Sequence, residues 1–142
     1  MEVNLSKAVP GYGPVTDGAV EGEILEVSEV KAEDGETVTA LRFRVKVLDR
    51  TTTVFLNTVP NQYQDEEKVT KGIVRALESV GYKKSEIAKI TDVTTAMFEG
   101  RTGQFEFSTW QGKQKLRFVK PYTFTKLVEE GKVAALEGEI DF

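Results

Sequence analysis

Neither cysteine nor histidine occurs among the 142 residues. Without cysteine the chain has no disulfide and no thiolate ligand for a metal ion. Without histidine it has no Ser-His-Asp or Cys-His catalytic group, and it lacks the commonest zinc ligand. Catalysis would have to depend on carboxylates, lysine, tyrosine, serine or an oxygen-ligated metal ion. We therefore expect a protein that is not an enzyme and that needs no cofactor or metal.

Long apolar runs are also missing. No run approaches the ~20 residues that a membrane-spanning helix needs. The first residues, MEVNLSKAVPGYGP, contain no basic segment followed by an apolar one, which a secretory signal would have. With cysteine absent as well, these features predict a cytoplasmic protein that forms one domain.

Charge is unevenly distributed along the chain. The formal net charge is -4, and residues 121–142 carry two lysines and five acids, which gives -3 for this segment. Basic residues cluster elsewhere, with four basic residues and one acid in 42–50 and five basic residues and one acid in 101–120. The chain therefore combines an acidic end with locally basic segments.

Apolar periodicity predicts three strands, a helix and two further strands. In the first strand, Val20, Gly22 and Ile24 fit one face and Leu25 and Val27 fit the other, which predicts a bulge near 24–25. The expected segments are strands at 19–30, 37–50 and 51–59, a helix at 65–82, one or two short helical turns within 83–98, a hairpin at 101–121 and a weak helix around 124–136.

Turn and cap residues mark the boundaries of these elements. Asp65 is expected to cap the helix and Gly81 to end it. Tight turns are expected at three pairs of residues, Asp34-Gly35, Asp49-Arg50 and Gln111-Gly112.

This element order predicts a mainly β protein. Five antiparallel strands with a helix between the third and the fourth match the OB-fold, a five-stranded, partly open Greek-key barrel. An α+β sandwich with the same elements but no closure is the alternative. The expected organisation is an irregular arm at 1–18, the barrel domain at 19–121 and an acidic tail at 122–142.

Two predicted strands carry rows of cations on one face. Leu41, Phe43, Val45 and Val47 alternate with the basic residues of the second strand, and the same alternation occurs in the fifth strand. A solvated sheet face explains one such strand, but two in a small sheet favour a groove for a phosphate backbone, where affinity comes from counterion release. The candidate phosphate-binding residues are Arg42, Arg44, Lys46, Arg101, Lys113, Lys115 and Arg117.

Aromatic residues divide into two groups. Trp110, the only tryptophan, lies at a predicted hairpin tip among basic residues, where it is expected to be partly exposed and to stack on a base. Phe55, Tyr63 and Tyr82 are further stacking candidates. The phenylalanines that follow the inward alternation are expected in the core, namely Phe43, Phe105, Phe107 and Phe118.

Other charged or glycine-rich segments have simpler explanations. Asp65, Glu66 and Glu67 suit the start of a helix better than a metal site. The segment GYGP at 11–14 lacks the lysine and the Ser/Thr of a phosphate-binding loop.

The segment MFEGRTGQFEFSTWQGKQKLRFVKP and the chain end EGEIDF resemble single-stranded DNA-binding proteins, especially the small OB-fold versions encoded by bacteriophages. The chain end is similar to the acidic tip of the bacterial proteins, with Asp141 in place of the proline before the final phenylalanine. The resemblance implies a DNA-binding protein of the bacterial host cytoplasm, acting in replication, recombination or repair. It also implies a tip that recruits partner proteins or competes with DNA, formed by Glu139, Ile140, Asp141 and Phe142.

The main hypothesis is therefore sequence-tolerant binding of single-stranded DNA without catalysis. One alternative is an adaptor for protein interactions that uses a small β-barrel and binds no DNA. Another is an oxygen-ligated metal enzyme acting on nucleic acid, which the lack of an acidic cluster disfavours. The sequence leaves open whether the protein is a monomer or a dimer.

Overall fold

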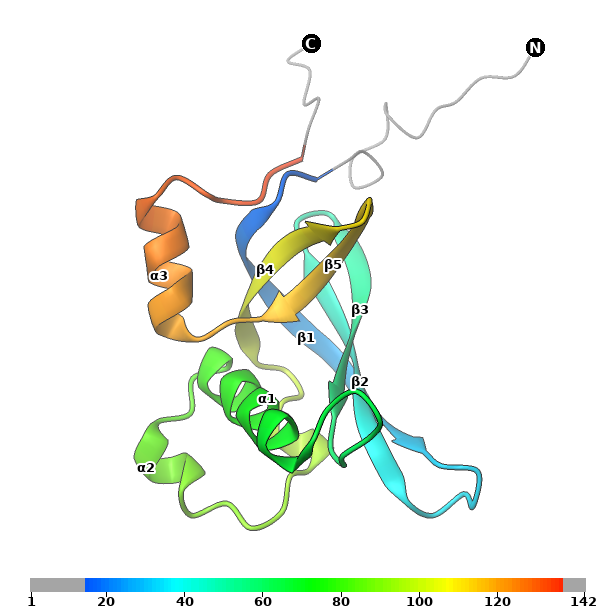
Figure 1. Cartoon of the computed structure of the whole chain (residues 1–142). Helices are drawn as coiled ribbons and strands as arrows, with labels where there is room; N and C mark the ends of the chain where they lie inside the picture. The colour runs from blue at the N-terminus through cyan, green and yellow to red at the C-terminus, as the bar shows by residue number, and fades with distance from the viewer. Residues whose placement is uncertain (1–14, 137–142) are drawn as a thin grey trace, which may run out of the picture.

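The computed structural model describes residues 15–136, which form one five-stranded antiparallel sheet and a few helices (Figure 1). The predicted order of three strands, a helix and two strands is confirmed. In chain order the elements are β1 (Gly18–Lys31), β2 (Val38–Val47), β3 (Arg50–Asn57), α1 (Glu66–Ser79), α2 (Lys84–Ile87), the 3-10 turn η1 (Thr95–Met97), β4 (Thr102–Trp110), β5 (Lys113–Phe118) and α3 (Pro121–Glu129).

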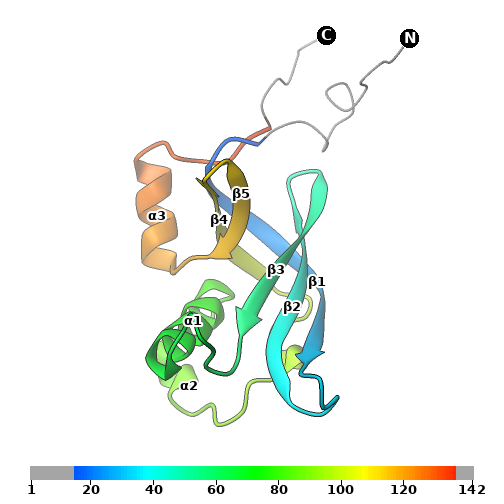
Figure 2. The same cartoon turned by 45° about the vertical axis from the view of Figure 1, so that its right-hand side comes forward.

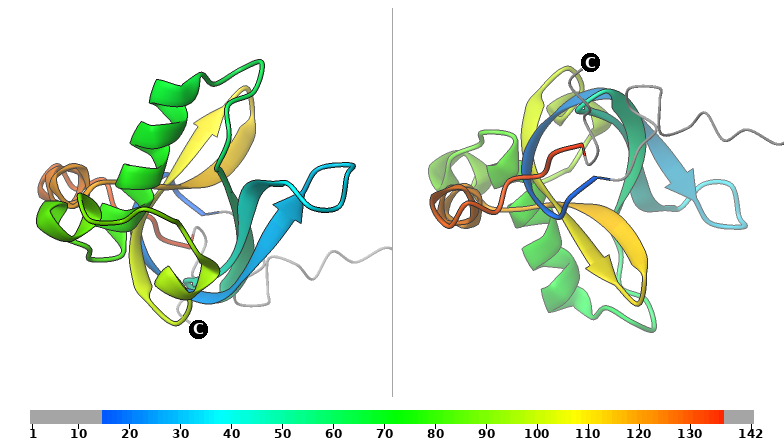
Figure 3. Two further views of the ribbon diagram at one scale, coloured as in Figure 1. Left: turned by 90° about the horizontal axis from the view of Figure 1, so that it is seen from below. Right: turned by 90° about the horizontal axis from the view of Figure 1, so that it is seen from above.

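The sheet has the strand order β3-β2-β1-β4-β5, so β3 and β5 form its two edges. It curls around a common interior, as the end-on views in Figure 3 show, and the two edge strands come into contact with each other. Helix α1 lies next to the ends of both (Figure 2). The fold is therefore mainly β, with a curled sheet that hydrogen bonds do not close.

The predicted bulge in β1 is confirmed. The pairing of β1 with β2 shifts register between Ile24 and Glu26. Because of the extra residue, Ile24 and Val27 both lie in the core, whereas Leu25 is 43% exposed. The bulge thus returns Val27 to the face from which strict alternation would exclude it.

Two glycines lie opposite each other where β1 pairs with β4. A Cβ atom on Gly22 would lie 2.6 Å from Cγ1 of Val45, and one on Gly103 would lie 2.7 Å from a ring carbon of Phe105. Neither position has room for a side chain. The paired glycines let the sheet curl tightly over these core residues.

The core is centred on phenylalanine rings. Phe43, Phe105, Phe107 and Phe118 are buried, as predicted. Phe98, which follows η1, is also fully buried and packs edge-on against Phe43, with 5.0 Å between ring centroids. Sequence periodicity did not identify Phe98, because it lies outside any strand.

Helix α1 has the predicted ends. Oδ1 of Asp65 accepts a hydrogen bond from the backbone N–H of Lys68, and Gly81 adopts a positive φ just after the helix. The turn between β2 and β3 was predicted at Asp49-Arg50 but lies one residue earlier. There Leu48 has a φ of 54°, and β3 already begins at Arg50.

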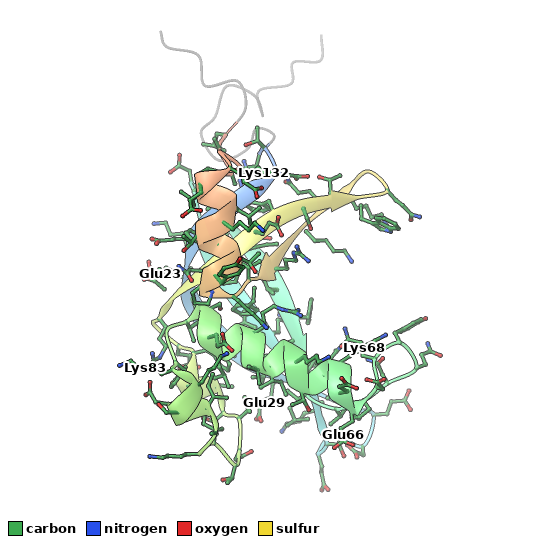
Figure 4. All side chains as sticks on the ribbon, turned by 60° about the vertical axis from the view of Figure 1, so that its left-hand side comes forward. Glu23, Glu29, Glu66, Lys68, Lys83 and Lys132 are labelled. Atoms are coloured by element: carbon green, nitrogen blue, oxygen red, sulfur yellow. The ribbon has the colours of Figure 1, made fainter. Side chains whose placement is uncertain are left out.

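The last described residues return to the start of the sheet. Helix α3 begins at Pro121, earlier than the predicted position around 124, because proline suits the first helical position. The backbone N–H of Ala19 then donates to the carbonyl of Lys132, and Leu136 pairs with Val15. Figure 4 shows Lys132 beside the first strand. These contacts join residues from both sides of the predicted domain boundaries.

Candidate functional site

A groove of about 600 Å³ lies between the two sheet edges and α1. Apolar side chains of both edges form its floor, and three cations and several amides lie around it. The lining residues are Thr52, Thr53, Val54, Phe55, Leu56, Asn57, Gln64, Val69, Gly72, Arg75, Phe107, Gln114, Lys115, Leu116, Arg117 and Phe118.

Strand β3 presents an exposed aromatic ring at this groove. Phe55 is 62% exposed, whereas its neighbours Val54 and Leu56 are buried, as alternation along a strand requires. Arg42 of β2 lies directly opposite Phe55 in the ladder. The outer face of β3 therefore places an exposed ring beside a cation.

The other two cations of β2 continue along the same face. Arg44 lies opposite Thr53, and Lys46 lies opposite Thr51. All three cations of β2 are exposed, as the predicted alternation requires. The row runs parallel to the edge strand that borders the groove.

Strand β5 brings cations to the opposite side of the groove. Lys115 and Arg117 are exposed, whereas Leu116 and Phe118 point into the core. Both cations line the groove together with Phe55, although the sequence separates them by sixty residues or more. Curling of the sheet therefore brings the basic strand β5 against the edge strand β3, which pairs with the basic strand β2.

Carboxylates on neighbouring strands orient two of these cations. Arg117 donates through Nε to Oε1 of Glu106 at 2.8 Å, and its Nη2 contacts the same oxygen. Arg44 makes an ion pair with Glu26 at 3.1 Å. Because both arginine side chains remain at least half exposed, the pairs fix their direction and leave donors facing solvent.

Trp110 lies at the tip of the β4–β5 hairpin. Its side chain is 77% exposed, as predicted, and Lys113 is its partner across the ladder. Gln111 and Gly112 form the predicted turn, with φ values of 51° and 76°. Two positive φ angles are the signature of a tight hairpin turn, which holds the ring away from the core.

A hydrogen-bond network fixes this hairpin to the beginning of β1. The carboxylate of Asp17 accepts from Nε2 of Gln114 at 2.9 Å and from Oγ1 of Thr109 at 2.8 Å. The hydrogen bond from Gln114, followed by that from Thr109, holds the pKa of Asp17 below its ordinary value. The hairpin that carries Trp110 is therefore tied to the sheet.

Tyr63 lies in the loop between β3 and α1 and is 79% exposed. Oδ1 of Asn61 accepts hydrogen bonds from the backbone N–H groups of Tyr63 and Gln64, at 2.8 and 2.9 Å. This side-chain turn gives the loop a defined shape, although Tyr63 does not line the groove.

Arg101 occupies a different part of the molecule. Its guanidinium lies 4.1 Å from the centroid of the Tyr82 ring, and its Nη1 donates to the carbonyl of Val80 at 3.3 Å. These contacts tie the start of β4 to the end of α1. Arg101 is thus not among the cations that the curled sheet gathers.

Sequence reasoning missed the other polar residues of the groove, which are Thr52, Thr53, Asn57, Gln64, Arg75 and Gln114. Arg75 lies on α1, three residues after Gly72 and six after Val69, so the three share one side of the helix. This spacing was the available signal. Nothing in the sequence showed that this side of the helix would meet the sheet edges.

The predicted partner-binding residues Glu139, Ile140, Asp141 and Phe142 lie outside the described residues. Within 15–136, no three acidic side chains are grouped so as to hold a metal ion. Among the helices of that same range, none is long and apolar enough to cross a membrane.

No protein-family model matches the chain, and a search of curated proteins finds no match.

Proposed function

We propose that the protein binds single-stranded DNA in the groove between β3 and β5, without strong sequence preference. The observation that carries the proposal is a partly apolar groove that is lined by Phe55 and by the cations Arg75, Lys115 and Arg117. The cations of β2 lie outside this lining, on the strand next to β3. A flexible strand offers phosphates for the cations and unstacked bases for the rings.

The same proposal covers the fold family and the cellular role. Five antiparallel strands, a central β1 paired with β2 and β4, and a helix between β3 and β4 support an OB-fold. The role that follows is protection of single strands during replication, recombination or repair, in the bacterial cytoplasm and without catalysis.

A titration of fluorescent oligo-dT at several salt concentrations tests the proposal. We expect binding at low salt, with log affinity falling by about 0.7 for each phosphate contact per log unit of salt, and thus by about 3.5 for five contacts. A duplex of the same length should bind more weakly, because its bases are not free to stack on exposed rings.

Matched charge variants locate the interface. Arg42→Ala and Lys115→Ala should each weaken binding and lower the salt dependence, since each removes one proposed phosphate contact. Lys83→Ala should leave both unchanged, because Lys83 precedes α2, away from β3 and β5 (Figures 1 and 4). Absence of binding at low salt, or a preference for duplex, would contradict the proposal and favour the adaptor alternative.

A further inference from the structure

A pair of side-chain amides lies beside the proposed stacking ring. Asn57 follows Phe55 by two residues in β3, so both side chains lie on the same face, about 7 Å apart along the strand. Nδ2 of Asn57 donates to Oε1 of Gln64 at 3.0 Å. Phe55, Asn57 and Gln64 all line the groove.

The loop holds Gln64 in this position. Asn61 accepts from the backbone N–H of Gln64 at 2.9 Å, and its own N–H donates to the carbonyl of Gln64, also at 2.9 Å. The next residue, Asp65, caps α1. The residues before and after Gln64 therefore fix its position at the groove, and its side-chain amide is already hydrogen-bonded to Asn57.

The bond between the two amides uses one N–H of Asn57 and one lone pair of Gln64, and it leaves one acceptor group and one donor group entirely unused. Oδ1 of Asn57 remains an acceptor and Nε2 of Gln64 remains a donor, and neither has another partner among residues 15–136. If both amides rotate by half a turn, the bond between them is kept and the two free groups exchange roles. The pair therefore offers a donor beside an acceptor in either order.

Unpaired bases present the complementary arrangement. Each of the four bases has a donor next to an acceptor on the edge that it uses in Watson–Crick pairing, and single-strand binders can hydrogen-bond to that edge. A base stacked on Phe55 would turn such an edge toward the neighbouring amides. In a duplex these same groups are occupied by the complementary strand.

We propose that Asn57 and Gln64 form a base-edge site that hydrogen-bonds to an unpaired base stacked on Phe55, and that exchange of donor and acceptor lets it accept any of the four bases. This inference rests on the proposed function, and it explains how a binder gains hydrogen bonds to bases while remaining tolerant of sequence. The site would also reject a paired base, because the Watson–Crick edge of that base is already hydrogen-bonded to the complementary strand.

The test compares oligo-dT with an oligonucleotide of the same length in which a nonpolar thymine isostere, difluorotoluene deoxyriboside, replaces every thymidine. The isostere keeps the shape of the base and loses its hydrogen-bonding edge. We expect the full-length protein to bind the isostere strand about three- to tenfold more weakly, the effect of one or two hydrogen bonds. The variant Asn57→Leu/Gln64→Met should bind both strands alike.

Two further variants complete the experiment. Gln104→Met, on β4 and outside the groove, should keep the discrimination of the native protein. Gln64→Met alone gives the same comparison where the double variant fails to fold, and it should reduce the discrimination, because only the amide of Asn57 remains.

The outcomes separate the two proposals. If oligo-dT does not bind at all, the proposed function fails and this inference fails with it. If oligo-dT binds but the isostere strand binds equally well, only the base-edge site is overturned. If the native protein discriminates and the double variant still does so, the hydrogen bonds arise elsewhere and the assignment to Asn57 and Gln64 is wrong.

Discussion

At the scale of single residues, exposure divides the aromatic rings into two groups with different roles. Phe43, Phe98 and Phe118 pack against one another in the core, whereas Phe55 of β3 and Trp110 at the end of β4 are mostly exposed. A large exposed ring gains little for stability. Exposed rings beside cations are therefore the residues most suited to contact a ligand.

Trp110→Ala should weaken binding of oligo-dT about five- to a hundredfold, since a base stacked on an aromatic ring contributes ~1–3 kcal/mol. Because Trp110 is the only tryptophan, quenching of its fluorescence reports directly on stacking in the native protein. The urea midpoint of the variant should match that of the native protein, as the ring is 77% exposed. Binding without quenching, and equal affinity of the variant, would exclude Trp110 from the interface.

Asp17 gives the stability of the hairpin a dependence on pH. Gln114 and Thr109 lower the pKa of Asp17 in the folded state, so its stabilising effect is complete above the unfolded pKa of ~3.9 and is lost as pH falls through the lower folded value. Asp17→Asn should therefore show a smaller loss of unfolding free energy between pH ~5 and ~2 in urea denaturation. Parallel pH profiles for the two proteins would show that the network contributes nothing.

At the scale of elements, glycines of β1 and α1 have opposite effects. Gly22 has core side chains within 2.7 Å of a Cβ position, whereas Gly72 has only Cδ1 of Leu56, at 3.9 Å. The strand glycine permits the curl of the sheet. The helix glycine weakens α1 and leaves space at the groove.

Two substitutions test this difference. Gly22→Ala should destabilise the protein by about 1–3 kcal/mol through overpacking. Gly72→Ala should stabilise it by about 0.5–1 kcal/mol, because alanine is the better helix former and its methyl group meets no close neighbour. Urea denaturation of both variants measures the change in the free energy of unfolding that each substitution causes. Stabilisation by Gly22→Ala would contradict the tight approach of β1 to the core.

At the scale of the whole molecule, the arrangement of charge matters more than its sum. The net charge is -4, yet Arg75, Lys115 and Arg117 line one groove, and the cations of β2 lie on the strand next to its β3 edge. We propose that the acidic chain end, outside the described residues, either competes with DNA for these cations or recruits a partner protein. Competition would act through charge and would therefore weaken with salt.

A chain ending at Leu136 tests the competition. It lacks Glu137, Glu139 and Asp141, so its net charge rises from -4 to -1, and it keeps the pairing of Leu136 with Val15. We expect tighter binding of oligo-dT at low salt and a difference that disappears at high salt. Replacing the three acids by amides in the full-length chain should have the same effect. Equal affinity of all three proteins would exclude competition and leave the recruitment of a partner.

Much of the fold and part of the site follow from the sequence alone. Alternation along β2 and β5 predicted which side chains are exposed, Asp65 and Gly81 predicted the ends of α1, and the pattern around Ile24 predicted the bulge. These features depend on residues a few positions apart. Local backbone geometry therefore decides them, whatever the rest of the chain does.

The groove itself was decided only by the tertiary structure. Curling of the sheet brings β3 against β5, places Arg75 beside both and aligns the amides of Asn57 and Gln64. It also separates Arg101 from the other cations and buries Phe98. Each of these outcomes joins segments distant in sequence, and they depend on how tightly glycines, a bulge and core rings let the sheet bend. Periodicity shows which face of a strand is exposed, but only packing decides which exposed faces meet.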